Sequence, residues 1–538
     1  MHTLTRLLAS LLLVAGLAPL ARATHIQGGT LTYTSLGNNQ YRVVLKHFRD
    51  CSGVSAPVSP TLECHTGAAC NLQPNLTVQM TLQGVPVFGN QYCATLSGVC
   101  TTTGPANYET NTYVATVTLP PADTWVLSSQ DCCRPSTANL VGQDAFRFET
   151  VLHNRVTVGG AVQIIANTSP VSSNMPVFFI PWKQLSILGN SAFDADGDSL
   201  VYSLVNPLQT CGTSSMYASR PASPISGIIS QNPPCAFINT AVSLVYTAAL
   251  PVNVTIDTTG TCPLRTSTVR FQFDPATGGI ALEPATYNAV APSAAGLNKY
   301  VVVVQIQELR RLGGQWVEVG VTRRELFLTV YNCGSNVPPT LARTATLHVG
   351  TARRTQLLTQ VIPVVAGEPV VLDLVATDRN VGQGITMSLA YNAVPGAVLT
   401  PTGAGLARLT FTPPQNLPSG TYRVAVTTED NNCPIKGHET QTLVFRVSAT
   451  VLGTRAGRAA TAVAAWPTPF AGVVQFQLPT SGAKMLNVTD ALGRTVATLL
   501  TNATGAGRWQ PAADIAPGLY LARTADGNAV VRLLYQPE

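Results

Sequence analysis

The sequence predicts an all-β protein built from tandem β-sandwich domains. Its 538 residues are 45% apolar and only 11% charged, which allows several buried cores and disfavours coiled coils and long surface helices. The 43 glycines and 38 prolines indicate many turns. No long 3.6-residue period competes with the short strand-like segments between those turns. At roughly 150 residues per domain, this length corresponds to about three or four domains.

Three segments carry the strand pattern most clearly. Residues 112–119 alternate apolar and polar side chains, as expected for a half-buried strand. Residues 299–306 form a nearly continuous apolar run, which predicts a strand buried on both faces. Residues 422–426 repeat the alternation further along the chain. Short strands separated by regular turns favour stacked β-sandwiches.

The first 23 residues predict a secretory signal peptide. Arg6 precedes an apolar run over 7–17, and Ala21-Arg22-Ala23 supplies an A-x-A cleavage site. A membrane anchor is the alternative, but the run is shorter than the roughly 20 residues that span a bilayer. We therefore expect cleavage after Ala23. Because no later stretch is long and apolar enough to span a membrane, we expect a soluble mature protein outside the cytoplasm.

The charge distribution disfavours a nucleic-acid partner. The formal charge is +6, and removing the two arginines of the signal peptide leaves 30 − 26 = +4. This charge is spread over the whole mature chain, with no run of five or more lysines and arginines. Nucleic-acid surfaces need a denser basic patch.

The cysteines agree with export. The chain has 12 of them, and none belongs to a C-x-x-C motif, which removes the usual signal for zinc or thioredoxin chemistry. Exported chains with an even number of cysteines usually form disulfides. Seven cysteines precede residue 140, so either one bridge crosses a domain boundary or some thiols stay free. The sequence leaves the pairing open.

Turn-rich joins divide the chain into successive parts. They lie near 169–176, 334–339 and 453–460, where Gly, Pro, Ser and Asn or small residues accumulate. The predicted parts are the signal peptide 1–23, a Cys-rich first region 24–168, a second region 169–336, a third region 337–450, a linker 451–463 and a C-terminal domain 464–538.

An acidic turn in the second region is the sharpest candidate site. Asp194, Asp196 and Asp198 alternate around Gly197, so their carboxylates can converge on a hard cation such as calcium. The turn is not an EF-hand, because Val205 stands at the twelfth position where a bidentate Glu is required. With three local acids we expect weak calcium affinity, roughly 10⁻⁴–10⁻³ M. A solvated hairpin turn is the alternative, since Asp-Gly favours hairpins.

A weak internal repeat accompanies this turn. The order strand end, Asp-led turn and second strand over 192–204 recurs over 375–389. The second copy keeps Asp378 but has lost most of its acids, which predicts a purely structural turn. Asp430, in the run 429–432 of Glu, Asp and Asn that ends a strand, could donate to an interdomain ion, but a plain turn is the better interpretation.

Catalysis finds little support in the sequence. It contains no G-x-S-x-G, no H-E-x-x-H and no phosphate loop, and no histidine lies in a recognisable motif. Trp125, Trp182 and Trp316 could line a platform for sugars, but each is better explained as a core residue. We therefore expect a non-catalytic protein.

The C-terminal domain resembles the type A C-terminal sorting domain of the type IX secretion system of Bacteroidota. The motif segments, in family order, are 466–470, 473–478, 486–496, 517–523 and 530–534. Trp466 and Thr468 depart from the usual Tyr-Pro-Asn-Pro-Phe, and the chain ends Gln536-Pro537-Glu538 rather than near a basic residue. The resemblance implies recognition by the outer-membrane secretion machinery and removal of the domain. The mature protein would then be released or attached to surface lipopolysaccharide.

Residues 24–336 look like the N-terminal part of surface proteins described as gliding-motility-associated. The matching segments are 24–33, 36–41, 48–53, 131–134, 169–170, the Asp194 turn and 332–333. His47-Phe48 and 323–325 depart from the family pattern. This resemblance implies membership but no biochemical activity. Cadherin-like folding is expected for the second region, and the third region loosely resembles cadherin-like or Ig-like modules.

Together these patterns predict an exported, non-catalytic, disulfide-bonded protein of the cell surface or extracellular space. An adhesive or structural role, stiffened by calcium, is the first hypothesis. A carbohydrate-binding protein that acts on extracellular polysaccharide is the alternative, and an extracellular hydrolase is a third. Fold class alone does not choose among them.

Overall fold

The structure is a computed structural model of the whole chain. The signal peptide predicted for 1–23 and most of the linker predicted for 451–463 lie outside the residues that it describes. The described residues are 26–51, 53–67, 74–89, 108–142, 144–172, 177–221, 236–238, 243–257, 262, 264–266, 268–289, 296–349, 351–389, 394–448, 461–462, 464–478, 482–490, 493–525 and 529–537.

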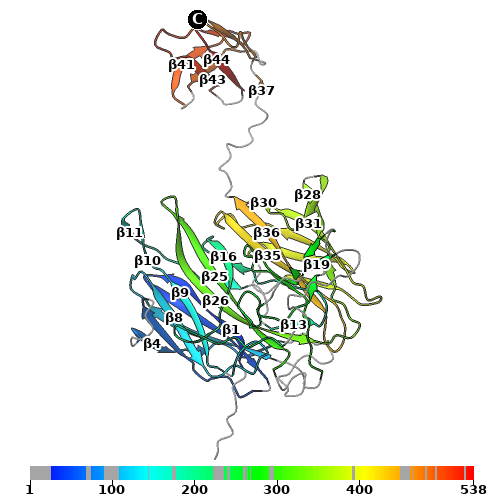
Figure 1. Cartoon of the computed structure of the whole chain (residues 1–538). Helices are drawn as coiled ribbons and strands as arrows, with labels where there is room; N and C mark the ends of the chain where they lie inside the picture. The colour runs from blue at the N-terminus through cyan, green and yellow to red at the C-terminus, as the bar shows by residue number, and fades with distance from the viewer. Residues whose placement is uncertain are drawn as a thin grey trace, which may run out of the picture. The chain divides into compact units, whose positions relative to one another are not determined.

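The fold is all-β, which confirms the predicted fold class of tandem β-sandwiches (Figure 1). The described residues contain strands, bridges and turns but no α-helix. The chain separates into two compact units, Met1–Ala449 and Thr450–Glu538, and the division falls beside the predicted linker. The first unit holds three of the hydrophobic cores described below, and the second unit holds its own.

One large sheet organises the first region. Its main path runs β4-β3-β8-β9-β26-β1-β2-β7-β5, so that the late strand β26 joins two early groups of strands. The strands are β1 (Ile26–Gly37), β2 (Gln40–Asp50), β3 (Thr61–Thr66), β4 (Leu76–Gln79), β5 (Thr81–Leu82), β7 (Tyr108–Thr118), β8 (Trp125–Asp131), β9 (Phe146–Leu152) and β26 (Gln315–Tyr331). Both groups bury one face in the same core, so the sheet curves around it.

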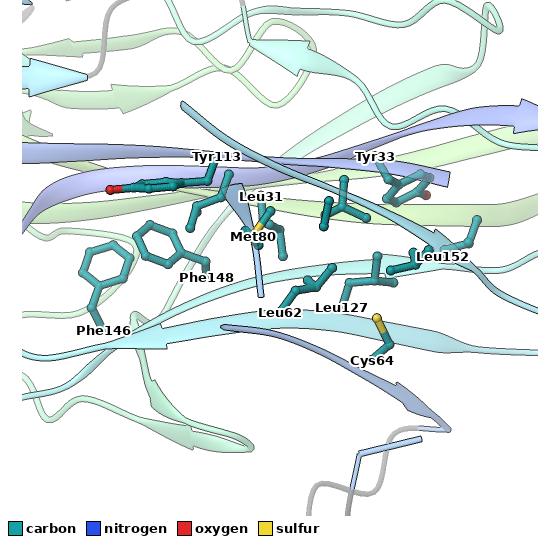
Figure 2. Packing of buried hydrophobic residues seen from close by; sticks show 14 of the residues in the cluster. Leu31, Tyr33, Leu62, Cys64, Met80, Tyr113, Leu127, Phe146, Phe148 and Leu152 are labelled. Carbon is teal, nitrogen blue, oxygen red and sulfur yellow. The ribbon is translucent and has the colours of Figure 1, made fainter. Parts of the chain in front are cut away.

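The first core follows from period-two alternation. Tyr41, Val43 and Leu45 on β2 are buried and alternate with more exposed residues, which places the apolar face of the strand inward. Figure 2 shows Leu31 and Tyr113 on one layer of strands and Leu127 on the other, with the core between the two layers. The core also contains Leu62, Cys64, Phe146, Phe148 and Leu152.

The second region shares the same sheet. Strands β13 (Val177–Pro181) and β25 (Lys299–Leu312) pair with β26, and β16 (Ser199–Val205) pairs with β25. Val301 and Val303 point into the first core, whereas Val302 and Val304 point into the second. The strand is therefore buried on both faces, as its apolar run predicts. The boundary predicted at 168/169 separates two cores but not two sheets.

A small sheet completes the second core. Its strands are β14 (Ser186–Leu188), β24 (Ile280–Leu282) and β23 (Phe271–Phe273), in that order. Leu188, Ile280, Leu282 and Phe271 are buried in the core with Tyr300. The neighbouring residues on these short strands point outward by alternation.

The third region is a sandwich of two sheets around one core. Leu372 and Phe411 from one sheet pack with Val424 and Phe445 from the other. The first sheet contains β29 (Ala352–Leu357), β28 (Thr344–Val349), β31 (Val370–Thr377), β34 (Leu406–Phe411) and β33 (Ala397–Gly403). The second contains β30 (Ile362–Val365), β36 (His438–Ser448), β35 (Gly420–Glu429) and β32 (Thr386–Leu389).

The second unit, 464–538 with its short leading strand, is a small two-sheet domain. Phe470, Trp509, Tyr520 and Leu533 are among its buried residues. One sheet contains β37 (Thr461–Ala462), β44 (Ala529–Tyr535), β43 (Gly518–Thr524), β40 (Met485–Thr489) and β41 (Thr495–Leu500). The other contains β38 (Ala464–Trp466), β39 (Val474–Gln477) and β42 (Ala506–Trp509).

Disulfides occur among the described cysteines. Cys132 and Cys133 are bonded to each other. Cys64 and Cys333 are free thiols, and burial raises the pKa of each to about 12. Both thiols therefore stay protonated at neutral pH and are poor nucleophiles and metal ligands. Further disulfide-bonded residues are Cys51, Cys211, Cys262 and Cys433.

Candidate metal centre

The acidic turn lies between β15 (Ala192–Phe193) and β16. Gly197 has a φ of 80°, a left-handed conformation that glycine adopts without strain. Asp194 Oδ1 accepts a hydrogen bond of 2.8 Å from the backbone N–H of Asp198, which closes the turn. The local sequence thus dictates the turn, and the carboxyl group of Asp194 helps to hold it.

The structure separates the three predicted calcium ligands. Asp194 and Asp198 are buried, with 3% and 5% of their surface exposed. The Asp196 side chain is 31% exposed. Its Oδ2 accepts hydrogen bonds from the backbone N–H of Thr168 at 2.8 Å and from Arg310 Nη2 at 2.9 Å. Asp196 contacts the same guanidinium as Asp198, but it is more exposed and is not part of the buried cluster.

Glu308 on β25 joins the two buried aspartates. One carboxylate oxygen from each of Asp194, Asp198 and Glu308 lies within 4.8 Å of the other two. Glu308 has 0% exposure, and it was not among the residues predicted from the sequence. The alternation of side chains along the strand could have identified it. Glu308 follows Val304 and Ile306 on the face of β25 that enters the second core. A charged residue on a buried face requires a partner.

Arg310 neutralises one side of the cluster. Its Nε and Nη2 each contact one oxygen of Asp198 at 2.7 Å, a bidentate pair. Nη2 also donates to Asn167 Oδ1 at 2.6 Å, and Nη1 donates to the Ala166 carbonyl at 2.7 Å. Glu308 and Arg310 are two apart on one strand, so both reach the acidic turn from the same face.

Two carboxylate oxygens in the cluster have no hydrogen-bond donor. Within the described part of the chain, Asp194 Oδ2 and Glu308 Oε1 are buried and unpartnered. The other oxygen of each of these two carboxyl groups has a donor: Glu308 Oε2 accepts from Asn167 Nδ2 at 2.6 Å, and Asp194 Oδ1 accepts the Asp198 N–H. Burial raises the pKa of Asp194 to about 7, and burial followed by the Asp194 charge raises the pKa of Glu308 well above its usual value.

These residues fit a hard cation. Buried ionised carboxylates are unfavourable unless they are paired or coordinate a metal. Calcium takes oxygen ligands from carboxylates and tolerates irregular geometry. Asp194 and Glu308 each offer an oxygen that the protein leaves without a donor. Asp198 would share its carboxylate between the cation and Arg310.

The cluster lies where the second region contacts the third. A Cβ placed on Gly197 would lie 2.7 Å from the Cβ of Pro418. The rings of Phe193 and Tyr422 are 6.0 Å apart. Arg423 donates from Nε to the carbonyl of Ala276 at 2.6 Å, which adds a polar contact across the same joint. The charged side chains of the acidic turn therefore lie next to the interface between the second and third regions.

The three tryptophans do not form a sugar platform. Trp125 is buried in the first core and donates from Nε1 to the Pro120 carbonyl at 2.8 Å. Trp182 packs against the second core. Trp316 is 60% exposed near the start of β26. The expectation of a core position holds for the first two and is wrong for Trp316.

Residues of the N-terminal motifs form buried ion pairs. Arg134 contacts Glu325 through two hydrogen bonds of 2.6 and 2.8 Å. Lys299 Nζ lies 3.1 Å from Asp50 Oδ2. These pairs connect strands of the first region to β25 and β26, so a structural role explains the motif residues.

Within the described residues, no helix has the length and apolar character needed to cross a bilayer.

Comparisons with known proteins do not assign a family. No protein-family model matches the chain, and no curated protein matches it. The tandem Ig repeats of Dlar align at 9% identity over 52% of this chain and 98% of that one, with a TM-score of 0.17. An endo-fucoidan hydrolase from glycoside hydrolase family 107 aligns at 13% identity over 70% of this chain and 40% of that one, with a TM-score of 0.15. Murine CEACAM1b aligns at 10% identity over 52% and 99%, with a TM-score of 0.13.

Such TM-scores carry no argument about fold or function. The all-β assignment rests on the observed strands, sheets and cores of this chain.

Proposed function

We propose that this chain is an exported, non-catalytic protein of the cell surface or extracellular space with an adhesive or structural role. A calcium ion held by Asp194, Asp198 and Glu308 braces the joint between the second and third regions. The observation that carries this proposal is the pair of buried, unpartnered carboxylate oxygens of Asp194 and Glu308 beside that joint. Calcium would supply positive charge and oxygen coordination there.

The ligand set differs from the one expected from the sequence. Glu308 replaces Asp196, which Arg310 and the Thr168 N–H already engage. Neutralising Asp196 should therefore leave calcium binding largely intact, whereas neutralising Glu308 should abolish it. The two substitutions distinguish the buried cluster from a simple three-aspartate loop.

Calorimetry of the chain without its signal peptide tests the metal site. Near 100 times the dissociation constant, calcium should stabilise the protein by about 2.7 kcal/mol and raise the Tm by about 2–5 °C over an EGTA sample. Glu308→Gln should remove this shift. Glu439→Gln is the matched control, because Glu439 is also buried, burial raises its pKa to about 7, and it lies outside the cluster. Identical melting of the unsubstituted protein in calcium and EGTA would overturn the proposal.

The C-terminal unit is proposed to be the sorting signal read by the outer-membrane secretion machinery. Support comes from the motif residues of 464–538 and from Phe470, whose ring packs 5.7 Å from Trp509 and 5.2 Å from Tyr535. The motif Phe thus anchors a compact domain. Its removal would leave the mature protein released or attached to surface lipopolysaccharide.

Terminal mass spectrometry of cell-surface and medium fractions tests export and sorting. The expected species begins at Thr24 and ends between 455 and 465. A surface form would favour adhesion or a structural coat, and a form confined to the medium would favour a diffusible protein. An exported species that retains Glu538 would contradict the sorting proposal.

A further inference from the structure

A cleft separates the small sheet of the second region from the third region. Its volume is about 590 Å³, which falls in the range of ligand sites, ~300–1,000 Å³. One wall comes from β14, β23 and β24, and the other from β36 and the segment after β29. Strands β14 and β36 lie close together across it.

The cleft walls are the outward faces of two sheets. Ile280 and Leu282 point into the second core, so Ala281 between them points into the cleft. On β36, Leu443 and Phe445 are buried in the third core, and Thr442 points the other way. Tertiary packing thus brings together two surfaces that would otherwise face solvent.

The lining offers neutral hydrogen-bonding groups beside apolar surface. Gln272 alternates with the core residue Phe271 and carries a side-chain amide that no hydrogen bond engages within the described residues. Ile187 and Ala281 add small apolar patches. Amides and hydroxyls can exchange hydrogen bonds with ligand hydroxyl groups.

The charges of the lining residues favour a neutral ligand over an ionic one. Asp274 is the ionisable side chain among the described lining residues. Its Oδ1 accepts the N–H of Ala276 at 2.9 Å and its Oδ2 accepts the hydroxyl of Thr277 at 2.6 Å, so the carboxylate serves its own turn. A charged ligand would lose hydration in the cleft without gaining a counter-charge.

We propose that this cleft binds a neutral oligosaccharide. Sugar hydroxyls match the free amide of Gln272, and the less polar faces of the sugar rings match Ile187 and Ala281. The inference goes beyond the structural role proposed above and does not depend on the cation, because the acidic cluster contributes no lining residue.

Titration calorimetry of the chain without its signal peptide against neutral hexasaccharides of glucose, xylose and mannose tests this site. The unsubstituted protein should bind at least one of them, in calcium and in EGTA alike. Ala281→Trp fills the cleft and should reduce that affinity at least about tenfold. Gln272→Ala removes the free amide and should cause a similar loss.

The matched control is Val398→Trp, which places the same side chain at an exposed position on β33, outside the lining. It should keep full affinity. No binding to any neutral hexasaccharide would overturn the proposal. So would unchanged affinity in Ala281→Trp, or tighter binding to a galacturonic acid hexamer than to every neutral sugar. Loss of calcium stabilisation with retained sugar binding would overturn only the metal proposal.

Discussion

Two Asp-led turns of this molecule share a local design but have different surroundings. In the second region, Asp194 begins a turn with the left-handed Gly197, φ 80°. In the third region, Asp378 begins a turn with the left-handed Gly382, φ 88°, and its Oδ1 accepts the Asn380 N–H at 2.7 Å. Each carboxylate therefore accepts a backbone N–H of its own turn, four residues on for Asp194 and two residues on for Asp378.

The difference lies in what the fold packs against each turn. Asp194 meets Glu308 and Asp198, and Arg310 is the basic side chain that pairs with this cluster within the described residues. Near the second turn the neighbouring acid is Asp430. Its oxygens accept N–H groups from Asn432 and Gly437 and from the Asn336 side chain, each at 2.9 Å. Amide donors satisfy Asp430, although Asp378 Oδ2 is also buried without a donor within the described residues. At the first turn, oxygens of three acids lie within 4.8 Å of one another, and this clustering is what suits a cation.

The largest expected effect tests the charge balance of the first turn. Arg310→Ala leaves Asp196 and Asp198 without their counter-charge, so in EGTA it should cost about 4 kcal/mol of unfolding free energy. Calcium should recover part of this loss because it supplies positive charge to the same cluster. Urea unfolding with and without calcium measures both values.

The matched control is Arg408→Ala. Arg408 pairs with Asp373, but its side chain is 45% exposed, so the cost should stay below about 1 kcal/mol. A loss for Arg310→Ala that calcium leaves unchanged would break the proposed contrast between the turns.

The second prediction concerns the acid that amides satisfy. Asp430→Ala removes the acceptor for three N–H donors and should cost about 3 kcal/mol. The cost should be equal in calcium and EGTA, because no cation is needed there. Urea unfolding again supplies the measurement. A calcium-dependent cost at Asp430 would show that both turns use the ion.

The smallest predicted effect compares the two turn glycines. Gly382→Ala adds a Cβ that meets no atom within 4 Å, so only left-handed strain remains, about 1 kcal/mol. Gly197→Ala adds the same strain and a clash with Pro418, for a total of about 3 kcal/mol. Thermal or urea unfolding of both variants gives the difference. Equal losses of unfolding free energy for the two variants would mean that a Cβ at position 197 does not clash with the third region.

Local patterning was enough to predict the strands and the acidic turn. Of the segments predicted as strands, 112–118 lies in β7, which ends one residue before the predicted end, and 299–306 lies in β25. Asp194 and Asp198 are buried together, but Asp196 is not with them. The hydrogen-bond partner of Asp196 is Arg310, which lies 114 residues further along the chain. No local pattern contains that distance.

The sequence by itself determined the all-β class, the turn that begins at Asp194, and the export and sorting signals proposed for the two ends of the chain. These depend on side-chain alternation and short motifs, which act over a few residues. Only the tertiary structure decided that β26 joins the first two regions and that Glu308 meets the acidic turn. It also decided that two outward sheet faces enclose a cleft. Strand pairing and core packing join residues that are distant in sequence, so their outcome depends on the whole folded chain.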